Sequence, residues 1–123
     1  VLQASTVGDL RVVAARVPDG VPAGDLRTLA NEARGRFGSE AGVVFFISSD
    51  TESGKVPFIA AATDAAVTAG VKAGDVVRTV APYVGGRGGG KPAMAQGSGS
   101  DVAGIDAAVK AVRDVVADAT GAK

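Results

Sequence analysis

Short apolar runs and longer runs with helical spacing alternate along the chain, and the two patterns predict different elements. The short runs are rich in valine and too short for stable helices, which favours β-strands. They cover residues 10–17, 43–47 and 56–62, and a further short strand is expected at 94–97. The connection between the second and third runs is too short for a crossover, so we expect this pair to be antiparallel.

Helical spacing of apolar residues predicts one helix over 25–37 and another from about 101 to 116. Asp25 is expected to cap the first helix and Gly38 to end it. The last helix has one apolar stripe and more aspartates than basic residues, so it is expected to pack on the sheet and not to enter a nucleic-acid groove. Its predicted stripe consists of Val102, Ile105, Val109, Val112 and Val116.

Two shorter helical segments are expected in the middle of the chain. Thr63 or Asp64 can cap a helical turn that ends near Gly70. Valines at helical spacing after residue 75 predict a second helix, which should stop near Ala81 because Pro82 lacks the N–H that a helix needs.

These elements predict an α/β fold with a single mixed β-sheet of four to five short strands, packed with three to four helices. The chain has 123 residues, which suits one domain with a core of ordinary size. Residues 1–8 show no period and are interpreted as a linker segment. Residues 9–121 are predicted to form a single globular domain.

The most distinctive segment is 85–90, where five of six residues are glycine and the exception is Arg87. Glycine permits positive φ and close approach to the main chain, so such a run can present bare N–H groups to an anion. We therefore expect an exposed loop in which Arg87 and Lys91 add positive charge. On this view a β-branched residue at Gly89 would be strained. A flexible linker is the alternative, but the structured sequence that follows argues against it.

Two phosphate-binding motifs are rejected at this segment. The pattern G-x-x-x-x-G-K is present, but Pro92 stands where a magnesium-binding Ser or Thr is required. The match to the dinucleotide-binding fingerprint is weak, and no strand is predicted before it.

Positive charge is concentrated around the same glycines. The whole chain has 13 basic and 13 acidic residues, which cancel. Residues 72–91 nevertheless hold four basic residues against one acidic residue, a net of +3. Coincidence of cations with bare backbone favours phosphate contacts, which salt should weaken. The four basic residues are Lys72, Arg78, Arg87 and Lys91.

Several kinds of chemistry lack the residues that they need. There is no Cys or His, so no zinc site of the usual kinds, no imidazole base and no disulfide are expected. We predict no catalytic residue and no metal ligand. The chain has no tryptophan and one tyrosine, Tyr83, which argues against a protein that binds single strands by stacking bases on aromatic side chains. No signal pattern or membrane-spanning run is present, so a cytoplasmic location is expected.

The segments GGRGGGKP at 85–92 and MAQG at 94–97 resemble the glycine-rich signature of the C-terminal domain of alanyl-tRNA synthetase. That domain belongs to an accessory family that also accompanies the catalytic domain of DHH-type phosphoesterases. The phosphoesterase branch typically has a histidine after its paired glycines. Arg87 stands at that place here, so the synthetase branch is the better match.

The resemblance implies a non-catalytic module that contacts the outer corner of tRNA(Ala) and helps to link aminoacylation with editing. The expected partners are tRNA(Ala) and the other domains of a parent synthetase, with no membrane. No cofactor is expected in this chain, whereas the parent would use ATP, Mg and Zn through its other domains. The residues expected to contact tRNA are Lys72, Arg78, Gly85, Gly86, Arg87, Gly88, Gly89, Gly90, Lys91 and Gln96.

Two alternatives stay open. The chain could be the substrate-binding domain of a DHH-type phosphoesterase whose catalytic domain is a separate unit. It could also be a dimerisation module that forms a homodimer, because the valine-rich final helix would suit a second copy.

The first testable prediction is that this chain by itself catalyses no reaction, because it lacks His, Cys and the phosphate-loop hydroxyl. Purified chain should neither hydrolyse ATP nor form alanyl-adenylate in a pyrophosphate-exchange assay. Turnover above the level of a mock purification would contradict this.

Overall fold

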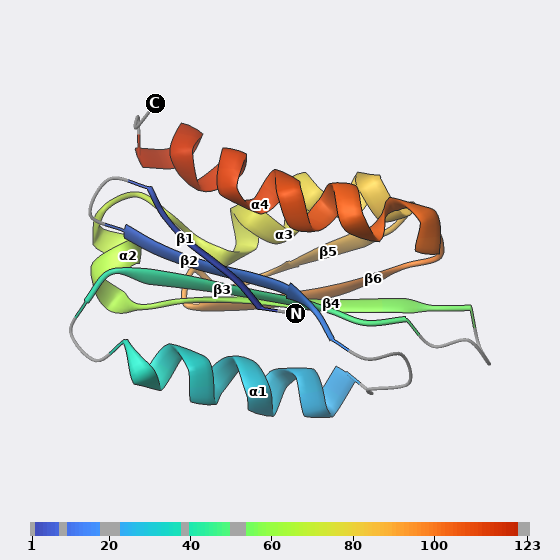
Figure 1. Cartoon of the computed structure of the whole chain (residues 1–123), viewed down its shortest axis with the longest axis horizontal. Coiled ribbons are helices and arrows are strands. Elements are labelled where there is room, and N and C mark those ends of the chain that lie inside the picture. Colours follow the sequence, from blue (N-terminus) through green and yellow to red (C-terminus); the bar gives the residue numbers. More distant parts are fainter. Residues whose placement is uncertain (1, 8–9, 18–22, 38–39, 50–53, 121–123) are drawn as a thin grey trace.

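A mixed sheet of six strands lies at the centre of the molecule (Figure 1). The computed structural model describes residues 2–7, 10–17, 23–37, 40–49 and 54–120. The strands lie in the order β1-β2-β3-β4-β6-β5, and only β2 and β3 are parallel neighbours. Their bounds are β1 Leu2–Val7, β2 Leu10–Arg16, β3 Gly42–Ile47, β4 Val56–Ala62, β5 Arg87–Gly90 and β6 Met94–Gly99.

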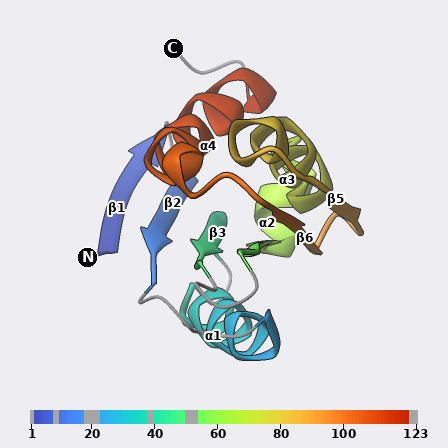
Figure 2. The ribbon, with the colours of Figure 1, turned by 90° about the vertical axis from the view of Figure 1, so that its right-hand side faces the viewer.

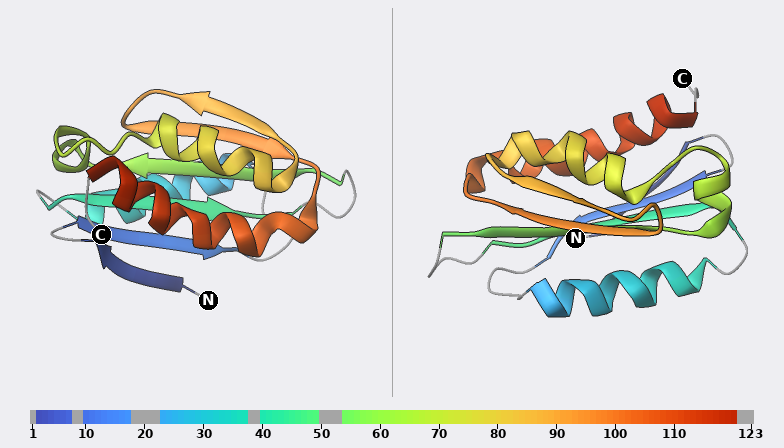
Figure 3. Two further views of the ribbon diagram at one scale, coloured as in Figure 1. Left: turned by 90° about the horizontal axis from the view of Figure 1, so that it is seen from above. Right: turned by 180° about the vertical axis from the view of Figure 1, so that it is seen from behind.

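Helices cover both faces of this sheet (Figure 2). The parallel pair β2–β3 needs a crossover, and α1 supplies it on one face. On the opposite face α3 and α4 lie side by side across the strands (Figure 3). The helices are α1 Ala23–Arg36, α2 Asp64–Thr68, α3 Ala73–Val80 and α4 Ile105–Thr120, with short 3₁₀ helices at Ala81–Val84 and Val102–Gly104.

Two apolar clusters form the core, one on each face of the sheet. β3 and β4 are buried along their whole length, as continuous apolar runs predict. On the α3–α4 face the rings of Phe45 and Phe58 pack with their centroids 6.1 Å apart. On the α1 face Phe46 and Ile59 pack against Leu26. Among the described helices, none is long and apolar enough to cross a membrane.

The predicted α/β fold with one mixed sheet is confirmed, as are several of its details. β3 and β4 pair antiparallel. The Thr63 side chain caps α2, because its hydroxyl accepts a hydrogen bond from the Ala66 N–H at 3.2 Å. α3 ends at Val80, and Pro82 lies in the 3₁₀ helix that follows.

The number of strands is a correction, since the sheet has six and we expected four to five. Residues 2–7 form β1 and pair antiparallel with β2, although we interpreted residues 1–8 as a linker. Residues 87–90 of the glycine segment form β5. Residues 87–90 have neither the alternation nor the composition of a strand, so pairing with β6 determines β5. In β1, Leu2 and Ala4 alternate with Gln3 and Ser5, a short strand signal that our interpretation missed. The limits of 9–121 for the domain stay a prediction.

Helix ends also differ in part from the expectation. α1 begins before Asp25, which therefore lies in the first turn, where its carboxylate still complements the helix dipole. Gly38 lies outside the described residues. Val102 is 41% exposed because it lies in the 3₁₀ helix before α4 and not on the apolar stripe. The Asp101 carboxylate accepts from the Ala103 N–H at 3.1 Å and caps this turn.

The remaining stripe of α4 is buried within the chain. Ile105, Val109, Val112 and Val116 belong to the cluster between the sheet and the α3–α4 layer. The stripe is therefore not available to a second copy of the chain, which removes the observation that favoured a dimerisation module.

One buried hydroxyl joins three segments of this fold. The Thr63 side chain donates to the Glu40 carbonyl at 2.9 Å and accepts from the Gly42 N–H at 2.9 Å. It also accepts the capping bond from Ala66. These bonds fix the start of β3 beside the start of α2.

We predict that Thr63→Val lowers the free energy of unfolding by about 1–3 kcal/mol, because two N–H groups would lose their acceptor in a buried place. Thr68→Val is the matched control, since Thr68 is exposed on the same helix. Urea unfolding followed by circular dichroism measures both variants. Equal stabilities would contradict the role of this hydroxyl.

Candidate nucleic-acid interface

The glycine segment lies at the edge of the sheet as one strand of a hairpin. β5 pairs with β6 from Arg87↔Ser98 to Gly90↔Ala95. The turn between them is closed by the Lys91 N–H, which donates to the Met94 carbonyl at 3.0 Å. The expected loop was therefore wrong for these residues, because glycine disfavours strands locally but the ladder to β6 overrides that preference.

Elements on both faces of the sheet hold the hairpin turn in place. The Ala73 N–H, at the start of α3, donates to the Pro92 carbonyl at 2.8 Å. From α1, the Arg34 guanidinium donates to the Ala93 carbonyl at 3.2 Å. The neighbouring strand contributes the Ala62 N–H, which donates to the same carbonyl at 2.9 Å. The turn is thus fixed between the two helix layers, and Lys91 beside it starts from a fixed backbone.

Close packing against α3 and β6 explains glycine at alternate positions of β5. A Cβ at Gly88 would overlap the Val77 side chain of α3. A Cβ at its register partner Gly97 would come within 2.6 Å of the Gly88 Cα. At Gly90 it would come within 2.7 Å of the Ala95 Cα. This face of the hairpin therefore has no room for side chains at Gly88, Gly90 and Gly97.

The turn into the hairpin needs a left-handed residue. Gly85 has φ 63° and ψ 35° and ends the 3₁₀ helix, with its N–H donating to the Pro82 carbonyl at 3.2 Å. The Gly86 N–H donates to the Ala81 carbonyl at 3.0 Å, which completes the turn. Gly85 is the glycine of this run at which the expected positive φ makes the turn.

Gly89 differs from the others. Its φ is not positive, so our expectation that a side chain there would be strained was wrong. A Cβ at Gly89 would meet nothing within 4 Å. Strand alternation directs this open position away from α3, towards the side of the sheet on which α1 lies.

Bare backbone is nevertheless presented at the edge. In an antiparallel ladder, residues alternately direct their amide groups to the partner strand and away from it. The Lys91 bond to Met94 sets this alternation, so Gly88 and Gly90 direct their groups away from β6. Within the described part of the chain no partner is found for these groups.

The four predicted cations lie on two sides of the hairpin. Arg87 and Lys91 are exposed, and alternation directs both to the same side as Gly89. Lys72 is exposed immediately before α3, beside the Pro92 turn. Arg78 lies on α3, where it forms an ion pair with Asp75 and donates to the Gly74 carbonyl at 3.3 Å. Its charge is therefore partly neutralised, on the opposite face of the sheet.

Gln96 is exposed as the register partner of Gly89, so it lies on the same side as Arg87. Two further polar residues of this region were missed by the sequence analysis, namely Ser98 and Arg34. Ser98 is the exposed register partner of Arg87. The seven-residue spacing of Arg27 and Arg34 places them on one side of a helix, but the sequence does not indicate which element that side faces.

Among the described residues, no group of three or more His, Cys, Asp or Glu side chains could hold a metal ion. The residues at this edge present guanidinium, ammonium, amide and main-chain donors. Such groups bind phosphate oxygens.

Comparison with known proteins agrees with this geometry. The profile of the DHHA1 domain matches residues 9–118, and the chain belongs to the DHHA1 domain family. Within that family it is similar to the C-terminal domain of alanyl-tRNA synthetase. The C-Ala domain of Aquifex aeolicus alanyl-tRNA synthetase superimposes with a TM-score of 0.78 at 28% identity, covering 93% of this chain and 97% of that structure. The resemblance drawn from the glycine segment is thus confirmed.

The chain is also similar in sequence to alanine–tRNA ligases. The chain is 59% identical over 114 residues to alanine–tRNA ligase of Corynebacterium jeikeium, and 53% identical over 119 residues to that of Nocardia farcinica. These matches cover 93% and 97% of the chain but 13% of each relative, so the chain spans about an eighth of their length. A solved DHH-domain protein shares the fold, with a TM-score of 0.57 at 12% identity.

The packing of the hairpin predicts opposite outcomes at two adjacent glycines. Gly88→Val should lower the free energy of unfolding by about 1–3 kcal/mol, because the side chain overlaps Val77 and crowds the β6 backbone. Gly89→Val should change it by less than about 0.5 kcal/mol, since that side is open.

Urea unfolding of both variants and the parent provides the test. Equal destabilisation of the two variants would show that α3 does not limit the space at Gly88.

Proposed function

We propose that the chain is the tRNA-binding C-terminal domain of a cytoplasmic alanyl-tRNA synthetase. In this proposal it contacts the outer corner of tRNA(Ala) and helps the aminoacylation and editing centres to act on one tRNA. The observation that carries the proposal is the hairpin edge, where Arg87 and Lys91 lie exposed on either side of Gly89.

Physical chemistry supports RNA backbone as the ligand of this edge. Arginine matches two phosphate oxygens with its planar fork, and lysine adds a mobile point charge. A glycine between them lets the backbone of another molecule approach the sheet. Structured RNA is commonly recognised by shape and by contacts to phosphate and sugar, without a code for bases.

The remaining reactions belong, in this proposal, to other domains of a parent enzyme. Those domains would use ATP, Mg and Zn, and this chain would supply binding and orientation alone. The sequence similarity to alanine–tRNA ligases over most of the chain favours this parent. The solved DHH-domain protein is similar in fold at 12% identity, which is weaker support for a DHH-type phosphoesterase.

A salt titration tests the proposal. The double variant Arg87→Ala, Lys91→Ala should bind a tRNA(Ala) transcript roughly tenfold more weakly than the parent chain, with a log–log salt slope shallower by about one to two units. For each phosphate contact that is lost, binding releases about one counterion fewer. The number of released counterions sets the slope.

The matched control is Arg36→Ala, Lys110→Ala, which removes one arginine and one lysine from exposed sites on α1 and α4. It should keep the affinity and slope of the parent. If both double variants lose affinity equally, only the net charge matters and the hairpin edge is not the binding site. No binding by the parent would refute the proposed function itself.

A further inference from the structure

α1 leaves one part of its face of the sheet uncovered. It packs on β3 and β4, where Leu26 and Ala30 join the cluster with Val44 and Ile59. β5 and β6 extend beyond it, and no helix lies beneath them on that side (Figure 2). We call this part the open hairpin face. It consists of Arg87, Gly89, Lys91, Gln96 and Ser98.

One side of α1 borders the open hairpin face, and a hydrogen bond identifies that side. Arg34 donates to the Ala93 carbonyl in the hairpin turn, so its side of α1 faces the hairpin. Arg27 lies seven residues earlier, which rotates it by only about 20° from Arg34. Asn31 lies between them and accepts from the Arg34 guanidinium at 3.0 Å.

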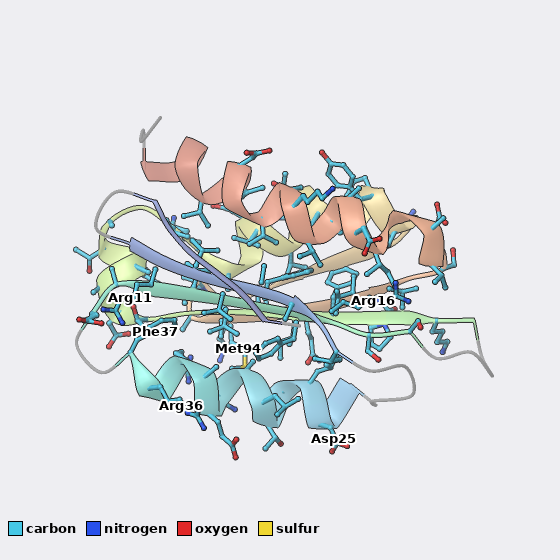
Figure 4. The ribbon with its side chains drawn as sticks, viewed as in Figure 1. Arg11, Arg16, Asp25, Arg36, Phe37 and Met94 are labelled. Carbon is cyan, nitrogen blue, oxygen red and sulfur yellow. The ribbon has the colours of Figure 1, made fainter. Side chains whose placement is uncertain are left out.

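The acidic residues of α1 lie on its other side. Asp25 precedes Arg34 by nine residues and Glu32 precedes it by two, which places both about 160–180° from Arg34 around the helix. Figure 4 shows Asp25 and Arg36 on the part of α1 away from the sheet. The side of α1 that borders the hairpin is therefore basic, with an amide between its two cations.

The cations of α1 and those of the hairpin form two roughly parallel rows. α1 joins two parallel strands, so it runs opposite to β3 and also to β6. Arg34 lies level with the hairpin turn, and Arg27 lies about 10 Å further along the helix, towards the level of Ser98. On β5, Arg87 is paired with Ser98, and Lys91 lies about 13 Å away beside the turn. Two basic rows thus border a strip of uncharged polar residues.

Charge and shape both indicate what such a strip binds. Among the described residues, neither Arg27 nor Arg87 forms an ion pair, so their charges are available to a ligand. Arg34 is held by two hydrogen bonds, yet its guanidinium has further N–H donors that these bonds do not use. Between the rows, Gly89 leaves space above the sheet. A polyanion with phosphates on both sides of such a strip complements it.

We propose that the Arg27–Arg34 side of α1 and the open hairpin face form one continuous surface for the sugar–phosphate backbone of RNA. This inference rests on the proposed function and adds to it which side of the sheet the RNA occupies. The RNA lies on the α1 side, where phosphates contact both basic rows. Arg78 lies on the other side and takes no part.

Two substitutions on the same helix test this placement. Arg27 and Arg36 are both exposed on α1 and lie nine residues apart, about 180° around the helix. Arg27→Glu and Arg36→Glu change the net charge equally, and circular dichroism checks that both variants are folded. Arg27→Glu should weaken binding of a tRNA(Ala) transcript by more than tenfold and make the salt slope shallower by about one unit. Arg36→Glu should change the affinity less than twofold.

The outcomes separate this inference from the function on which it rests. If the Arg87→Ala, Lys91→Ala variant loses binding while Arg27→Glu and Arg36→Glu behave alike, the RNA does not contact α1 and the inference is overturned. The proposed function would survive that result. If the parent chain binds no RNA, both are overturned. A loss confined to Arg27→Glu and the hairpin variant supports the continuous surface.

Discussion

Direct contact between the backbone of the β5–β6 hairpin and α3 is the constraint on which the candidate site depends. Val77 occupies the space that a side chain at Gly88 would need, and Gly97 lets β6 approach the same point. Because protein interiors pack closely, helix and hairpin hold each other in one position. The exposed side of the hairpin is then a fixed platform, and its cations lose less conformational freedom on binding than they would on a mobile loop.

The same packing separates two kinds of glycine that the sequence cannot distinguish. Gly88 and Gly90 are needed for the contacts of β5 with α3 and β6, whereas Gly89 lies on the open side, where no neighbour limits its size. If the whole run were an anion-binding loop, all of these positions would be glycine for the same reason. In a strand there are two different reasons, since side chains alternate between the faces of a sheet.

Local partners also determine which cations can serve a ligand. Arg78 shares its charge with Asp75 on α3, while Arg87 has no acidic partner among the described residues. An exposed ion pair of this kind adds little to stability, but it lowers the positive potential at that place. The positive charge of residues 72–91 is thus divided between the faces of the sheet, and Arg87 and Lys91, on the side bordered by α1, form no ion pair among the described residues.

The sequence by itself determined the elements whose signals are local. The apolar runs of β3 and β4, the Thr63 cap and the stop at Pro82 follow from side-chain burial, hydrogen bonding and backbone restriction within a few residues. The glycine-rich signature likewise indicated the family. Tertiary structure alone decided that Arg87–Gly90 is a strand, since glycine has no strand preference and β6 supplies the ladder. It also decided that Arg27 and Arg34 face the hairpin, because helix periodicity gives the sides of α1 but not what lies beside them.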